Sequence, residues 1–123
     1  ISKGVVYMNI NKFTKKSMES VNLCTEIARE YNNQELIPAH LLNALLTLDE
    51  SLIVNLLKKM DIQPEVLNAQ VEGLLRKRPK VSGGEPYVGR ELNDVLVHAE
   101  DEAGQMKDSY VSVEHIFLSL IKN

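Results

Sequence analysis

The chain has 123 residues, of which 44% are hydrophobic and 25% charged, and its net charge is −3. This length allows one domain with a hydrophobic core, and the composition is typical of a soluble globular protein. The acidic net charge disfavours general binding to nucleic acid or to an anionic membrane surface. A single cysteine excludes an intramolecular disulfide and fits a reducing cytoplasm. No apolar run approaches the ~20 residues that a membrane-spanning helix needs.

The first residues carry little structural information. Ile1–Tyr7 is too short and too weakly basic for a signal peptide, and Met8 is a candidate natural start. We therefore assign residues 1–13 to an N-terminal extension and entry segment.

Up to residue 78, apolar residues recur at helical spacing. Thr14 is the expected N-cap of the first helix, and Pro38 suits the first position of the second, where its missing N–H is not needed. Pro79 ends the fourth helix. The predicted helices are Lys15–Tyr31, Pro38–Leu48, Ser51–Met60 and a fourth from Pro64 to Lys77 or Arg78.

The second part of the chain is shorter. Lys80–Gly89 contains glycines and a proline, so we expect neither helix nor strand there. A fifth helix is predicted at Arg90–Met106, and a sixth runs from Ser112, its expected cap, to about Lys122. Since no segment shows convincing strand alternation, the sequence predicts an all-α fold.

The two parts resemble each other at an offset of 75 residues, which lays His115 on His40. Apolar positions match at eight places, and recurrence of this kind indicates two copies of one helical unit. We therefore expect a pseudo-two-fold repeat of a four-helix unit. The divisions are a first copy at 14–79, a connector at 80–89 and a second copy at 90–123. The second copy has only two helices, so we expect the chain to be a fragment with apolar surface exposed on those two. The matched pairs are Val21/Leu96, Cys24/Ala99, Ala28/Ala103, Tyr31/Met106, Leu41/Ile116, Leu42/Phe117, Leu45/Leu120 and Leu46/Ile121.

No catalytic or metal-binding constellation stands out. His40 and His115 suit a repeated packing or capping role better than a paired metal or acid–base site. Cys24 lies on the apolar stripe of its helix, so we expect a core residue. Gly83-Gly84 lacks the Lys-Ser/Thr pair of a phosphate loop.

Two charged runs and one loop are of interest. We expect the acidic run at 100–102 to be a solvated helix face, and the basic cluster at 76–80 to suit the negative end of a helix dipole. The loop from Asp108 to Glu114 combines apolar and acidic residues. It is either a structural turn or the lip of a peptide-binding groove, and the residues alone favour neither.

Four segments resemble the N-terminal domain of Clp-type AAA+ chaperones, ClpB disaggregases in particular. The resemblance covers nearly the whole chain from Met8 to Asn123. Its last two segments are quite specific in this order and spacing. The segments are Met8–Thr14, Ile37–Leu46, Pro79–Gly84 and Asp108–Leu120.

The resemblance implies a domain that engages unfolded or aggregated polypeptide and passes it to an ATPase ring for threading. By motif, it implies substrate contacts for Thr14, Asp108 and Glu114, and we infer apolar groove walls beside them. It assigns His115 no role. The inferred wall residues are Leu96, Tyr110 and Val113.

For a longer protein, the resemblance implies a cytoplasmic homo-hexamer that uses ATP and Mg²⁺ in its ring and works with a co-chaperone system of the DnaK type. It implies neither a cofactor nor a metal for residues 1–123, and no nucleic-acid or membrane partner. Two alternatives remain: the N-domain of a ClpC- or ClpA-type unfoldase that docks adaptors for a protease, and a stand-alone helical-repeat adaptor.

Overall fold

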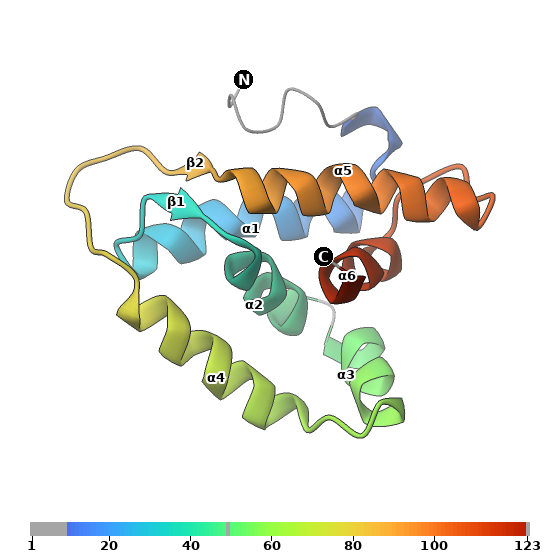
Figure 1. The fold of residues 1–123 in the computed structure, drawn as a ribbon, viewed down its shortest axis with the longest axis horizontal. Helices are drawn as coiled ribbons and strands as arrows, with labels where there is room; N and C mark the ends of the chain where they lie inside the picture. The colour runs from blue at the N-terminus through green and yellow to red at the C-terminus, as the bar shows by residue number, and fades with distance from the viewer. Residues whose placement is uncertain (1–9, 49, 123) are drawn as a thin grey trace.

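A computed structural model describes residues 10–48 and 50–122, so the expectations about Ile1–Tyr7 and Met8 lie outside the described residues. The all-α prediction is confirmed (Figure 1). A short 3-10 turn at Ile10–Lys12 precedes the first α-helix. The elements are α1 (Lys15–Glu30), β1 (Glu35–Leu36), α2 (Pro38–Leu48), α3 (Glu50–Lys59), α4 (Pro64–Lys77), β2 (Tyr87–Val88), α5 (Arg90–Gln105) and α6 (Val113–Lys122).

The helices begin and end where local chemistry dictates. Thr14 Oγ1 accepts a hydrogen bond of 3.1 Å from Ser17 N, which caps α1 as predicted. Helices α1, α3 and α5 each end in a reversal whose turn residue has a positive φ, and a backbone N–H then bonds the carbonyl five residues back. The turn residues are Asn32, Asp61 and Lys107.

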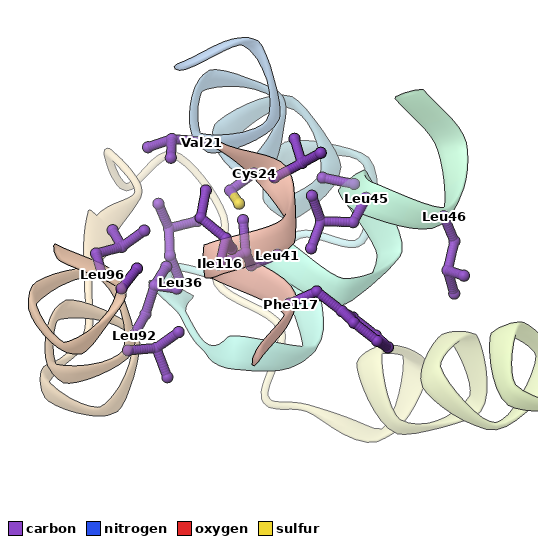
Figure 2. Close-up of a cluster of buried hydrophobic side chains, with 14 of the residues drawn as sticks. Val21, Cys24, Leu36, Leu41, Leu45, Leu46, Leu92, Leu96, Ile116 and Phe117 are labelled. Atoms are coloured by element: carbon purple, nitrogen blue, oxygen red, sulfur yellow. The ribbon is translucent and has the colours of Figure 1, made fainter. Parts of the chain in front are cut away.

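The core lies where α2 meets α6, with α1 packed on α2 and α5 packed on α6. Leu41 and Ile116 are fully buried there, in the same cluster of buried side chains as Leu36 (Figure 2). The expected burial of Cys24 and Ala28 in the α1 stripe is confirmed. Each buried large aliphatic side chain contributes about 1.5–3 kcal/mol relative to its exposed state, so these contacts dominate the stability.

Helix α4 packs mainly against α2 and forms the outer side of the first copy (Figure 1). Within residues 10–48 and 50–122 no single helix is long and apolar enough to cross a membrane. Helices α2 and α3 meet that criterion only as a pair bent by 109°.

The connector was expected to contain no strand, and this expectation is wrong. Strands β1 and β2 pair in parallel, with Leu36 opposite Val88. A second parallel bridge joins Phe13 to Val111. Two-residue strands carry no alternation, which explains why the sequence pattern missed them.

These two pairings correspond at the offset of 75 residues. Gly89 N donates to Leu36 O at 2.9 Å, and Thr14 N donates to Val111 O at 2.9 Å. In each case the segment before one long helix pairs with the loop after the other. Backbone hydrogen bonds therefore join each half of the chain to the other half. They also hold the loop before α6 against the start of α1.

Candidate functional site

The loop before α6 is anchored through the backbone of Val111. Val111 N donates to Lys12 O at 2.7 Å, and Val111 O accepts from both Thr14 N, at 2.9 Å, and the buried Ser17 Oγ, at 2.7 Å. Every backbone hydrogen-bonding group of Val111 is thus satisfied by α1 or the turn before it. The backbone of this loop is therefore held against the start of α1.

A histidine beneath the loop holds its first acidic side chain. His115 Nε2 lies 2.8 Å from Asp108 Oδ2, and His115 Nδ1 accepts a hydrogen bond of 2.9 Å from Ser112 N. Because Nδ1 is an acceptor, the ring hydrogen of the neutral form resides on Nε2, which donates to the carboxylate. The His115 side chain is buried, whereas that of Asp108 is 48% exposed.

Three exposed side chains of this loop and of the first turn of α6 are acidic or aromatic. Tyr110 is 61% exposed, the largest fraction among the exposed large apolar residues of the described chain. Glu114 is exposed at the second position of α6, where the positive end of the helix dipole favours a carboxylate. We call Asp108, Tyr110 and Glu114 the 108–114 surface. Such a surface can contact both an apolar and a cationic part of a polypeptide.

Thr14 lies next to this surface but is committed to the fold. Its Oγ1 accepts from Ser17 N and lies 2.6 Å from Ser17 Oγ, and its backbone bonds Val111. Thr14 is half-buried, so a role in polypeptide contact stays a prediction.

Two expected groove-wall residues are not on the surface. Leu96 is 0% exposed on the inner face of α5, and Val113 is 5% exposed at the start of α6. The expectation that these two side chains form an exposed wall is therefore wrong. Leu96 corresponds to Val21 at the offset of 75, and both positions belong to the buried stripes.

The expectations for the charged runs need one correction. Glu102 was expected on a solvated face, but it is buried and forms an ion pair with Lys122 at 3.0 Å. This pair links α5 to the end of α6. In the basic cluster, Arg78 pairs with Glu35 at 3.1 Å, and Lys80 Nζ donates to Tyr31 O at 2.8 Å.

At the corresponding position of the first copy, the side chain that faces the histidine is buried. His40 Nδ1 accepts from Ile37 N at 2.9 Å, and its Nε2 lies 3.0 Å from Asn33 Oδ1. Asn33 is buried, and its amide donates to Leu75 O at 3.4 Å and to Pro79 O at 3.5 Å at the end of α4. Burial, aided by the charge of Arg78, lowers the pKa of His40 to about 4.

The predicted capping role of the two histidines is thus confirmed. Each occupies the third position of its helix and accepts the N–H of the residue before that helix, which is one half of a capping box. The link from His115 to Asp108 was missed, although the identity of the histidines and the change from Asn33 to Asp108 were both visible at the offset of 75.

Two features of the described residues bear on metal binding and on thiol chemistry. Among these residues, no group of three or more histidine, cysteine or acidic side chains is placed to hold a metal ion. Burial raises the pKa of Cys24 to about 12, which keeps its thiol protonated and unreactive.

Comparison with known proteins assigns the chain to a family. The sequence pattern of the Clp repeat (R) N-terminal domain matches residues 12–123. The chain belongs to this family. Chaperone protein ClpB of Porphyromonas gingivalis is 45% identical over 114 residues, which cover 93% of this chain and 13% of that protein. ClpB of Nitratidesulfovibrio vulgaris is 42% identical over 120 residues, which cover 94% of this chain and 14% of that protein.

Solved structures agree with this assignment. The Hsp104 N-terminal domain from Candida albicans superposes with a TM-score of 0.80 at 29% identity, covering 89% of this chain and 73% of that one. The N-terminal domain of ClpV1 ATPase from E. coli has a TM-score of 0.82 at 18% identity, covering 93% of this chain and 70% of that one. At that identity the likeness shows the fold alone. The chain therefore has the fold of a Clp N-terminal domain and is similar in sequence to ClpB chaperones, of which it spans about one-eighth of the length.

Proposed function

We propose that this Clp repeat domain binds unfolded or aggregated polypeptide through the 108–114 surface and delivers it to the ATPase ring of a ClpB-like disaggregase. The observation that carries the proposal is the exposure of Asp108, Tyr110 and Glu114 on a loop whose backbone is fixed to α1. The names of the relatives support a ClpB-like role over a ClpC- or ClpA-like one.

The chemistry of this surface suits weak and unselective binding. One exposed ring and two carboxylates offer a small contact area, and small interfaces retain little free energy after the cost of association. A capture domain has to release its substrate to the ring, so a modest affinity is an advantage. The carboxylates favour polypeptide segments that carry basic side chains beside apolar ones.

The proposal also covers the other parts of the longer protein. In a longer protein, this domain precedes ATPase modules that assemble as a cytoplasmic homo-hexamer and use ATP with Mg²⁺. A co-chaperone system of the DnaK type supplies aggregated substrates. We place no cofactor on residues 1–123.

Nuclear magnetic resonance tests the location of binding. The isotope-labelled domain is titrated with a permanently unfolded polypeptide, such as reduced and carboxymethylated α-lactalbumin. We expect fast-exchange shift changes centred on residues 108–114. Shift changes confined to the outer face of α4, or none at millimolar polypeptide, would contradict the proposal.

A further inference from the structure

We infer that His115 is a positioning residue: it fixes the orientation of the Asp108 carboxylate on the 108–114 surface. Its importance for binding rests on the proposed function, whereas the positioning itself does not. The evidence is the bond of 2.8 Å between His115 Nε2 and Asp108 Oδ2, made by a buried ring to a half-exposed carboxylate.

The ring of His115 is held at both ends. Ser112 N donates to Nδ1 at 2.9 Å, and Ser112 Oγ lies 3.1 Å from the same atom. These contacts place the hydrogen on Nε2 and aim it at Asp108, because a neutral imidazole has one donor and one acceptor nitrogen. The helix cap therefore sets the direction of the bond to Asp108.

The consequence is a carboxylate with one committed oxygen and one available oxygen. Oδ2 accepts from His115, and among the described residues no partner is seen for Oδ1. An exposed aspartate without this bond would sample several rotamers, and binding would then have to order it at an entropic cost. His115 meets that cost during folding, before any polypeptide arrives.

The first copy shows that a histidine at this helix position does not by itself orient an exposed carboxylate. Like His115, His40 accepts the backbone N–H of the residue before its helix through Nδ1. Its Nε2, however, contacts the buried side-chain amide of Asn33, which also donates to carbonyls at the end of α4. A carboxylate cannot donate in this way. The replacement of Asn33 by Asp108 at the equivalent position turns an internal clamp into an outward-facing acceptor.

The test uses His115→Gln, with His40→Gln as the matched control. Glutamine at the third helical position can still accept the N–H of Ser112, as in an ordinary capping box, but it lacks the rigid second nitrogen that reaches Asp108. The first readout is the χ1 rotamer of Asp108, from three-bond couplings to its Cγ. We expect one rotamer in the wild type and in His40→Gln, and averaged couplings in His115→Gln. A single rotamer in His115→Gln would overturn the inference, whether or not the domain binds polypeptide.

The second readout is a double-mutant cycle on polypeptide binding. His115→Gln should weaken binding about three- to tenfold, the effect expected for losing one pre-ordered side chain. In an Asp108→Ala background the same change should have no further effect. An equal loss in both backgrounds would show that His115 acts on the fold and not through Asp108. If the wild type fails to bind, the proposed function fails, while the rotamer measurement still decides the positioning role.

Discussion

The start of α2 and the start of α6 are built alike but present opposite surfaces. Each begins with a histidine that accepts the preceding backbone N–H through Nδ1, at 2.9 Å in both places. Beyond the ring, His40 meets the buried Asn33, whereas His115 meets the half-exposed Asp108. The comparison shows that the same capping arrangement lies beside a buried side chain in one copy and beside a half-exposed side chain in the other. The residue that faces the histidine, Asn33 or Asp108, makes this difference.

The neighbouring positions strengthen this contrast. Glu35 in the first copy pairs with Arg78 at the end of α4, and the equivalent Tyr110 is 61% exposed. Ala39 at the second position of α2 becomes Glu114 in α6. The two copies therefore share buried positions such as Cys24/Ala99 and Leu41/Ile116, and differ at the positions around the two histidines.

The largest expected effect tests the shared core. Leu41→Ala and Ile116→Ala truncate equivalent, fully buried side chains. Each should lower the free energy of unfolding by about 2–5 kcal/mol, from lost transfer energy and from the remaining cavity. Urea unfolding followed by circular dichroism measures both. A loss below about 1 kcal/mol for only one of the two would show that the copies do not contribute equally to one core.

The next prediction separates the copies by pH. The pKa of His40 is lowered to about 4, so its charged form is disfavoured in the folded state and stability is lost as pH falls below the ordinary value of 6.5. Between pH 7.5 and 5, this loss should amount to about 2 kcal/mol.

The control for this pH effect is His40→Gln, which retains a capping acceptor but does not titrate. We expect the pH slope of the unfolding free energy in this range to become shallower in His40→Gln. An unchanged slope would show that other groups account for the pH dependence.

A smaller effect concerns the residues before the two long helices. A Cβ at Gly89 would lie 2.5 Å from Glu35 Oε2 and 2.9 Å from Leu36 O, so Gly89→Ala forces a shift of β1. Thr14→Ala removes the cap of α1 instead. Thermal unfolding should show a loss of about 1 kcal/mol for each, for these two different reasons. Increased stability of Gly89→Ala would contradict the close approach of β1.

The smallest expected effect on stability is at the two exposed tyrosines. Tyr87 is 49% exposed in β2, which pairs with the first copy through β1, and Tyr110 is 61% exposed in the loop of the second copy. Because neither side chain is part of the core, Tyr87→Ala and Tyr110→Ala should each change the unfolding free energy by less than about 0.5 kcal/mol. Differential scanning calorimetry checks this, and it establishes the pair as a clean comparison for binding.

The sequence was sufficient to predict the helices but not how their faces are used. Apolar spacing of three and four residues located the stripe containing Cys24 and Ala28, because burial on one side of a helix leaves that period. Strands β1 and β2 have two residues each, too few for any period. They form because the backbone groups of Leu36 need partners, which pattern alone does not reveal.

The candidate site was predictable in part for the same reason. The exposure of Tyr110 follows from a loop rich in polar residues, and its part in binding stays a prediction. Leu96 and Val113 were misplaced because both are apolar neighbours of that loop in sequence, whereas the fold turns them inward. The bond from His115 to Asp108 joins residues seven positions apart across a loop, so it depends on a turn geometry that the sequence does not specify.

The most direct test of the central claim is the dissociation constant of a permanently unfolded polypeptide for Tyr110→Ala and for Tyr87→Ala, measured side by side. If the 108–114 surface captures polypeptide, Tyr110→Ala should weaken binding about tenfold, as expected for loss of an aromatic anchor, and Tyr87→Ala should bind like the wild type. Equal binding by all three proteins, or a loss only in Tyr87→Ala, would contradict the account.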